Sequence, residues 1–235
     1  MSENSSAVQF LYGTVVGRAL LKGIMVTHGD RLAVSFLRSR WSRPVIKPYA
    51  KRHGIQLDPE QMKSFRTYRD FFARTRPQVP MDMEPTHLIS PCDSWLSAYP
   101  ITEHSSFAIK NSHYQLRDFL QDEELAARFQ GGDCLIFRLC ASDYHHYCYI
   151  DDGFKSRNRH IRGHYHPVQP VVVRKRPVFM QNTREYCVLY TENFGPVVQI
   201  EVGACLVGKI ENYRQAGVIH RGEEKGLFRF GGSTI

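Results

Sequence analysis

Histidine and cysteine residues gather in the middle of the sequence. They are Cys134, Cys140, His145, His146, Cys148, His160, His164 and His166. Histidine transfers protons near neutral pH, and both residue types bind metals such as zinc. No CxxC pair occurs, however, and the spacings match no standard zinc signature. A metal site is therefore an alternative that the spacing does not favour, and no metal is predicted.

A second reactive group stands at the end of the sequence, in Gly231-Gly232-Ser233-Thr234. In isolation this tetrapeptide is typical of a turn with polar neighbours. A serine hydroxyl is a weak nucleophile and reacts only when a base takes its proton. The two glycines let the backbone before Ser233 adopt strained conformations and approach other groups closely. The role of Ser233 therefore depends on the segments that surround it.

The net charge of +8 is unevenly distributed along the chain. Residues 1–80 hold 14 of the 31 Lys and Arg but 5 of the 23 Asp and Glu, which leaves 17 against 18 in residues 81–235. This asymmetry indicates an anionic partner, or else a solvated basic helical face. Nucleic acid is not expected, because the basic residues interleave with an amphipathic helical pattern and form no reader motif.

The N-terminal third reads as helical. Residues 7–26 have apolar residues at helical spacing, and residues 30–53 place Arg and Lys beside Leu, Phe, Trp and Ile. This composition is typical of a helix at a membrane interface, although a helical lid packed on a core has the same pattern. No signal peptide is evident, and no apolar stretch reaches the ~20 residues that span a bilayer.

A third helix is predicted over residues 58–76, opened by Asp58-Pro59 and ended by Pro77 and Pro80. We place the domain boundary at this point. Residues 1–80 form a basic amphipathic helical region, and residues 81–235 form a β-rich catalytic domain.

After Pro80 the pattern changes to short runs rich in Val, Ile, Tyr and Cys, separated by turns. One helix is predicted over 115–130, closed by Gly131-Gly132. The six cysteines are expected to be free thiols in a reducing compartment. The predicted fold class is α+β, with an N-terminal helical, membrane-facing segment followed by a mainly antiparallel β core.

Seven segments together resemble the phosphatidylserine decarboxylase family, in the order that the family has them, and they cover most of residues 60–235. They are YRDFFAR (68–74), SPCDSWLS (90–97), RLCASDYHHY (138–147), NTREY (182–186), NFGPVVQIEVGACLVGKI (193–210), RGEEKG (221–226) and FGGST (230–234).

The resemblance implies a proenzyme that cleaves itself between Gly232 and Ser233. The Ser233 hydroxyl would attack the Gly232 carbonyl and form an ester, and elimination and hydrolysis would leave a covalent pyruvoyl group and ammonia. This pyruvoyl cofactor would form a Schiff base with phosphatidylserine and act as an electron sink. Loss of carbon dioxide would then yield phosphatidylethanolamine.

The resemblance also implies roles for individual residues. Asp93 matches the family's self-processing aspartate, which would orient a histidine, and His145 matches a histidine implicated in decarboxylation. The family's DYHRxH motif places its triad histidine where this chain has Cys148, which would act as a base only as a thiolate. Histidines 145, 146, 164 and 166 are possible substitutes for that base, and His166 is preferred. Ser94 and His146 also depart from the family pattern, which has glycine and arginine there.

The expected partners are phosphatidylserine and an anionic membrane surface, with the protein peripheral on the cytoplasmic face of the cell membrane. A homodimer or a cleaved heterodimer is expected. Cys148 and the stop after Ile235 leave a second hypothesis, in which a truncated or degenerate homologue binds lipid surfaces without catalysis.

Overall fold

The computed structural model describes residues 35–77, 80–102, 116–140, 142–163, 182–204 and 209–229. The helix predicted over residues 7–26 and the first residues of the 30–53 segment lie outside these ranges. Gly232, Ser233 and His166 lie outside them as well.

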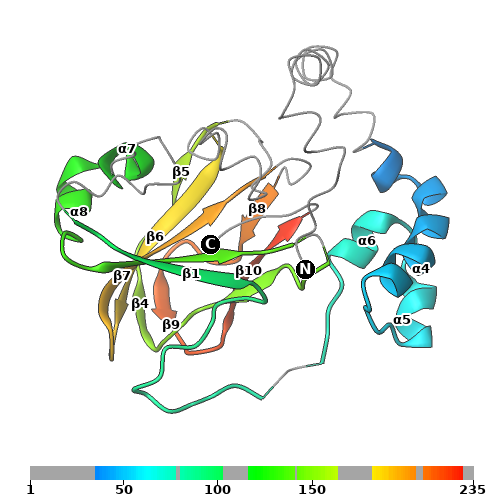
Figure 1. The fold of residues 1–235 in the computed structure, drawn as a ribbon, viewed down its shortest axis with the longest axis horizontal. Helices are drawn as coiled ribbons and strands as arrows, with labels where there is room; N and C mark the ends of the chain where they lie inside the picture. Colours follow the sequence, from blue (N-terminus) through cyan, green and yellow to red (C-terminus); the bar gives the residue numbers. More distant parts are fainter. Residues whose placement is uncertain are drawn as a thin grey trace.

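The described helices of the N-terminal region gather at one side of the molecule (Figure 1). They are η1 (Arg40–Ser42), α4 (Arg43–Arg52), α5 (Pro59–Ser64) and α6 (Tyr68–Phe72). Their buried faces form a cluster of their own that includes Ile46, Phe65 and Phe71. No helix in the described ranges has the length and apolar character needed to cross a bilayer. The domain boundary near residue 80 stays a prediction.

The single helix predicted over residues 58–76 is wrong, because the segment forms two short helices. Asp58 caps α5 through the Glu60 N–H, and Pro59 stands at its first position, as predicted. The break comes at Thr67, whose hydroxyl accepts from the Asp70 N–H while the Asp70 carboxylate accepts from the Thr67 N–H. This capping box starts a new helix and offers the backbone an alternative to continuing the first one.

The rest of the described chain is mainly β, and every strand pair in it is antiparallel, as predicted. The strands are β1 (Trp95–Pro100), β2 (Asp133–Arg138), β3 (His146–Cys148), β4 (Gly153–Lys155), β5 (Arg159–Ile161), β6 (Arg184–Thr191), β7 (Gly195–Val202), β8 (Lys209–Asn212), β9 (Gly217–Ile219) and β10 (Glu224–Arg229). The α+β class is therefore confirmed for these residues.

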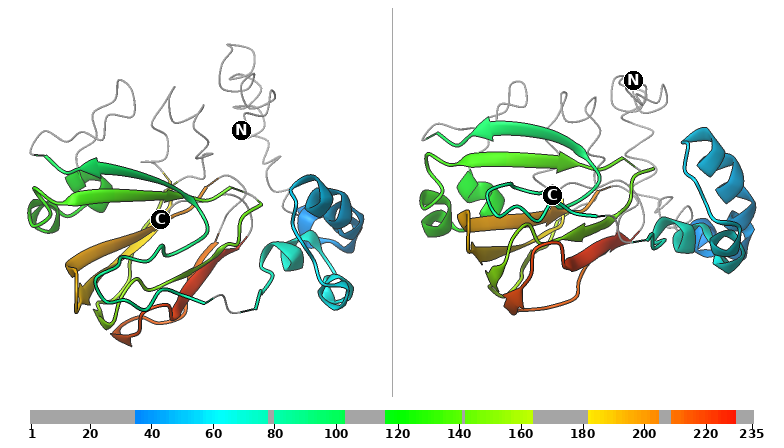
Figure 2. Two further views of the ribbon diagram at one scale, coloured as in Figure 1. Left: turned by 60° about the horizontal axis from the view of Figure 1, so that its bottom comes forward. Right: turned by 90° about the horizontal axis from the view of Figure 1, so that it is seen from below.

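The strands are arranged in layers (Figure 2). The β1–β2 pair forms a two-stranded sheet beside the remaining strands, which form the sheets β3-β10-β8 and β5-β6-β4-β9 with β7 paired to β6. Helices α7 (Leu116–Leu120) and α8 (Glu123–Ala127) lie at the end of the β region opposite the N-terminal helices (Figure 1).

The helix predicted over residues 115–130 is also interrupted. Gln121 has a positive φ of 50°, and Asp122 then caps α8 by accepting from the Leu125 N–H. Gly131, at φ 79°, follows the end of this segment, and its N–H donates to the Ile101 carbonyl. The predicted glycine end is confirmed, since glycine tolerates a left-handed backbone.

A buried ion pair lies at the centre of the β region. Lys225 Nζ of β10 donates to Glu201 Oε1 of β7 at 2.6 Å, and both side chains are fully buried. Lys225 also donates to Asn212 Oδ1 of β8 at 2.8 Å, so three strands meet at one ammonium group. Burial raises the pKa of Glu201, an effect that Lys225 and Asn212 oppose. The neighbouring Gly226 lies so close to β8 that a Cβ there would sit 2.1 Å from the Glu211 carbonyl oxygen.

Replacing one partner of this pair should be far more harmful than replacing both. Lys225→Met leaves an uncompensated carboxylate in the interior, so the free energy of unfolding should fall by about 3–5 kcal/mol. The double variant Lys225→Met/Glu201→Gln removes both charges and should regain most of that loss. Denaturant unfolding measures both effects. Lys63→Met, which breaks an exposed ion pair with Glu60 at 2.6 Å, is the control and should change stability by less than about 1 kcal/mol. Equal losses in the single and double variants would contradict this account.

Candidate active site

Strand β3 carries the end of the Asp143–Cys148 segment and lies directly beside β10. Their antiparallel register pairs Cys148 with Glu224 and His146 with Leu227, and the Phe228 N–H donates to the His145 carbonyl at 2.9 Å. Strand β10 ends at Arg229, four positions before Ser233 in the sequence. The fold therefore places the histidine segment alongside the strand that leads to the Gly-Gly-Ser motif.

Strand geometry separates the side chains of β3 onto two faces. Because neighbouring residues of a strand point in opposite directions, His146 and Cys148 share one face and Tyr147 points to the other. Tyr147 faces the core, where its ring lies 5.5 Å from Lys225 Nζ and its hydroxyl donates to Asn212. His146 is thus the nearest side chain of β3 on the same face as Cys148.

His146 is held by a carboxylate and an aromatic ring. Its Nδ1 lies 2.6 Å from Glu224 Oε1, and the Tyr213 hydroxyl donates to the same carboxylate oxygen at 2.6 Å. The imidazole stacks on the Tyr144 ring with centroids 4.5 Å apart and planes 5° apart. The other ring nitrogen, Nε2, is buried and has no hydrogen-bond partner among the described residues. A carboxylate-oriented histidine with one nitrogen left open is the arrangement of a general base.

Asp93 lies near this group and is bound by arginine. Arg76 Nη1 donates to Asp93 Oδ2 at 2.5 Å and Nη2 donates to Oδ1 at 3.1 Å, a bidentate pair. The same guanidinium lies 4.3 Å from the centroid of the Tyr144 ring, which also stacks on His146. The predicted role of Asp93 in orienting a histidine is not visible among the described residues and stays a prediction.

His145 is fully buried between the α6 region and its own loop. Its ring centroid lies 4.0 Å from that of Phe72. Its Nδ1 is 2.9 Å from the Asp143 carbonyl oxygen, which can only accept, so Nδ1 carries a proton. Arg74 donates to the Ser142 carbonyl at 3.0 Å. The YRDFFAR motif therefore supports the loop that presents His145.

Cys148 is buried and its thiol is neutral near pH 7. Burial raises its pKa to about 11, and its Sγ makes a weak contact of 3.9 Å with the Ser90 carbonyl oxygen. Burial also raises the pKa of the neighbouring Cys92 thiol to about 12. A cysteine acts as a base only as a thiolate, so Cys148 is a poor candidate for that role.

The described ranges thus bring Asp93, His145 and Cys148 into one region and leave Ser233, Gly232 and His166 unplaced. The five cysteines in these ranges are free thiols, as predicted. No three His, Cys, Asp or Glu side chains in the described part of the chain gather in a way that would hold a metal ion; His164 and His166 are outside it.

Two residues of the site were not identified from the sequence. Arg76 lies just after the YRDFFAR motif, and no sequence signal distinguishes it from the other basic residues nearby. Glu224 is part of the quoted RGEEKG motif, but its role depends on the register between β10 and β3. His146 was named from the sequence as one of four possible substitutes for the base, with His166 preferred.

Comparisons with known proteins show the family of this chain. The profile of the phosphatidylserine decarboxylase family matches residues 67–235. The chain is 42% identical to phosphatidylserine decarboxylase proenzyme 2 of Clostridium acetobutylicum over 231 residues, 97% of this chain and 79% of that protein. It is 37% identical to the phosphatidylserine decarboxylase proenzyme of Ruminiclostridium cellulolyticum over 253 residues, 99% of this chain and 84% of that protein. The chain belongs to the phosphatidylserine decarboxylase family.

Alkylation of Cys148 in the folded protein should be slow. With a pKa of about 11, roughly one thiol in a thousand is ionised at pH 8, against about a quarter for an ordinary cysteine thiol of pKa ~8.5. Iodoacetamide labelling followed by peptide mass mapping should show Cys148 modified at least about a hundredfold more slowly than in the same protein unfolded in denaturant. Rapid labelling of Cys148 in the native protein would show that its thiol is exposed and activated.

Proposed function

We propose that this protein is a phosphatidylserine decarboxylase proenzyme that generates its own pyruvoyl group from Ser233. The observation that carries the proposal is the pairing of β3 with β10, which sets the His145–His146 segment beside the strand leading to Ser233. Six residues of chain after Leu227 reach at most about 20 Å, so Ser233 is tethered to the region of that segment. Membership of the family supports the same reaction.

Self-cleavage begins when a base removes the Ser233 hydroxyl proton and the oxygen attacks the Gly232 carbonyl carbon. The C–N bond breaks as the new C–O ester forms, and the nitrogen takes up a proton. Loss of the serine α-proton then eliminates the upstream chain as a carboxylate that ends at Gly232. Hydrolysis of the remaining dehydroalanine releases ammonia. The first step requires a base at neutral pH, and histidine is suited to it.

His146 is the base that the geometry favours. Its Nδ1 is bound to Glu224, so the carboxylate orients the ring and stabilises the imidazolium that forms. Its Nε2 is buried and open within the described residues. It also shares a face of β3 with Cys148, the position at which the family has its triad histidine. His166, the substitute preferred from the sequence, remains a second candidate.

The residues around the site suit a pyruvoyl group, because the Nε2 of His146 is a buried polar atom with no hydrogen-bond partner among the described residues. When present, that group supplies a carbonyl that withdraws electrons as the carboxylate of an amine substrate departs. His145 is the proposed proton donor to the substrate, acting as an imidazolium that gives up its Nε2 proton and keeps the one on Nδ1. Its Nδ1–H is held by the Asp143 carbonyl, and Phe72 covers the ring, which keeps the imidazole in one orientation.

The proposed substrate is phosphatidylserine and the proposed product is phosphatidylethanolamine. Because this substrate is a bilayer lipid, we propose that the protein works at an anionic membrane surface, peripherally and on the cytoplasmic side. The basic excess of residues 1–80 supports this location. We also propose that the working protein is a homodimer or a cleaved heterodimer.

Replacing Ser233 by alanine should abolish self-cleavage, because no hydroxyl remains to attack Gly232. Intact mass spectrometry of the unmodified protein should show an N-terminal fragment that ends at Gly232, and borohydride should trap a carbonyl on the downstream fragment. The Ser233→Ala protein should keep its full mass and trap nothing. An unmodified protein that keeps its full mass, traps no borohydride and releases no carbon dioxide from phosphatidylserine would leave only the non-catalytic lipid-binding hypothesis.

The rates of self-cleavage of variants at His146, Glu224 and Cys148 should show which residue acts as the base. His146→Gln should slow self-cleavage by about 10²–10⁴-fold, the usual contribution of a general base. Glu224→Gln should have a smaller effect, because it removes only the group that positions the ring. Cys148→Ser should change the rate little, since a neutral thiol contributes no base. The accumulation of the cleaved fragment over time provides the measurement.

His87→Gln is the matched control, because His87 forms a similar pair with Asp82, Nδ1 to Oδ2 at 2.8 Å, on the exposed surface. Thermal melts of each variant check that the fold is kept. If His146→Gln cleaved at the normal rate while His166→Gln did not, the base would be His166.

A further inference from the structure

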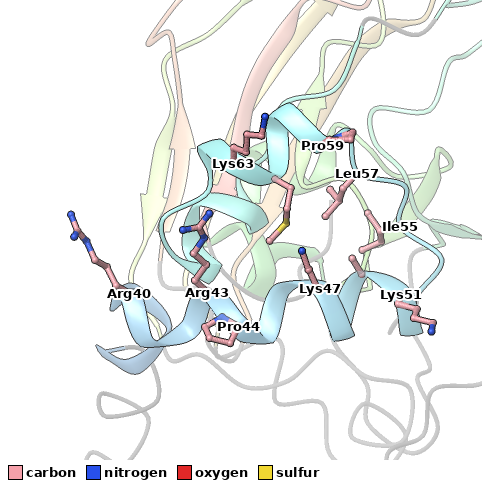
Figure 3. Close-up of a pocket in the computed structure, with 11 residues that line it drawn as sticks. Arg40, Arg43, Pro44, Lys47, Lys51, Ile55, Leu57, Pro59 and Lys63 are labelled. Atoms are coloured by element: carbon pink, nitrogen blue, oxygen red, sulfur yellow. The ribbon is translucent and has the colours of Figure 1, made fainter.

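The helical region contains a groove between α4 and α5, and every residue that lines it lies between Arg40 and Lys63. Figure 3 shows Arg43 and Lys47 rising from α4 into the space between the two helices, with Ile55 and Leu57 near one end. The cavity volume is about 900 Å³. Its lining is Arg40, Arg43, Pro44, Lys47, Ala50, Lys51, Ile55, Leu57, Pro59, Met62 and Lys63. The groove is open to the surface.

Within the part of the chain that the structure describes, the charge of the groove is mostly basic and unpaired. Five of its lining residues are basic and none is acidic. Lys63 pairs with Glu60 at 2.6 Å, whereas Arg40, Arg43, Lys47 and Lys51 form no ion pair with an acidic side chain in the described ranges. Four basic side chains around one cavity produce a positive potential that an anionic ligand would neutralise.

The interior of the groove is apolar. Ile55, Leu57 and Met62 line it and also pack against the buried cluster beneath α4. On the neighbouring surface, η1 presents Trp41 at 82% exposure, and Phe36 and Val45 are also exposed. A basic rim, an apolar floor and an exposed tryptophan together form the pattern of a surface that enters a bilayer interface.

We propose that the α4–α5 groove is a binding site for an anionic phospholipid that is not the substrate. The phosphate of the headgroup would be held by Arg43 and Lys47, and the first carbons of an acyl chain would lie on Ile55, Leu57 and Met62. This inference rests on the membrane location proposed above and not on the processing of Ser233, because all of its residues belong to the helical region. The site would hold the protein on anionic bilayers whether or not substrate is present.

The composition of the groove favours a lipid over other anionic partners. A nucleic acid backbone would use the arginines and lysines but would leave the aliphatic floor exposed to water, at a cost in hydrophobic free energy. An acidic peptide would not account for the exposed Trp41 beside it. A single lipid uses both features, because it carries a negative charge and a hydrocarbon chain on one molecule.

Vesicle binding tests the proposal without using substrate. Phosphatidylcholine vesicles with and without phosphatidylglycerol should be compared by flotation, using the intact chain. Arg43→Glu/Lys47→Glu should weaken binding to the anionic vesicles by roughly 30-fold or more, since each basic residue lost near an anionic surface costs about fivefold. The control Arg157→Glu/Arg162→Glu changes net charge equally at exposed positions in the β region and should bind almost normally.

A second measurement reports on the bilayer interface. Trp95→Phe leaves Trp41 as the single tryptophan, and its emission should shift to the blue and be quenched by brominated lipid on anionic vesicles. Adding Arg43→Glu/Lys47→Glu should abolish both changes. The proposal would be overturned if the intact chain bound neutral and anionic vesicles equally, or if the control variant lost as much binding as Arg43→Glu/Lys47→Glu. It would also be overturned if the intact chain bound an oligonucleotide in preference to the anionic vesicles. The same holds if Arg43→Glu/Lys47→Glu lost self-association while its lipid binding was unchanged. None of these outcomes alters the result expected for Ser233.

Discussion

Strand β10 is the element on which the candidate site depends, and a buried charge pair holds it. Lys225 occupies the centre of β10, and its ammonium group binds Glu201 and Asn212 from two other strands with no exposure to solvent. An ammonium group buried in this way stays favourable only while its partners remain in place. The pair therefore couples the strand that leads to Ser233 to β7 and β8. Gly226, pressed against the Glu211 carbonyl, allows the same close approach.

The register that results brings together segments distant in the sequence. Arg76 follows α6, Asp93 precedes β1, His146 lies on β3 and Glu224 on β10, yet they form one connected set of contacts. The links are the Arg76–Asp93 ion pair, the stacking of Tyr144 between Arg76 and His146, and the His146–Glu224 pair. Each of these residues restricts its neighbour, so the orientation of the His146 ring depends on the whole set. Such mutual restraint is what a pre-organised proton-transfer site requires.

Cys148 gives this chain its own version of a family site. Burial keeps its thiol neutral, so the position that carries a histidine in the family pattern offers no base here. On the function proposed above, His146 takes over the role of base, which strand geometry permits because it lies two residues from Cys148 on the same face of β3. The two departures from the family pattern, at His146 and at Cys148, would then be one change. The base would have moved by one repeat of the strand, to a position where its Nδ1 meets Glu224.

Much of this protein was determined by local sequence. The short runs rich in Val, Ile, Tyr and Cys after Pro80 predicted antiparallel strands, Asp58-Pro59 predicted the start of α5, and the ordered motifs identified the family, because each of these signals lies within a few neighbouring residues. Tertiary structure decided the rest. Thr67 and Gln121 broke two predicted helices, because a capping box and a left-handed residue outweighed helical periodicity there. Arg76 and Glu224 joined the site only through strand register and loop packing. Residues 76, 93, 146 and 224 are far apart in the chain, and no local pattern specifies which of them meet.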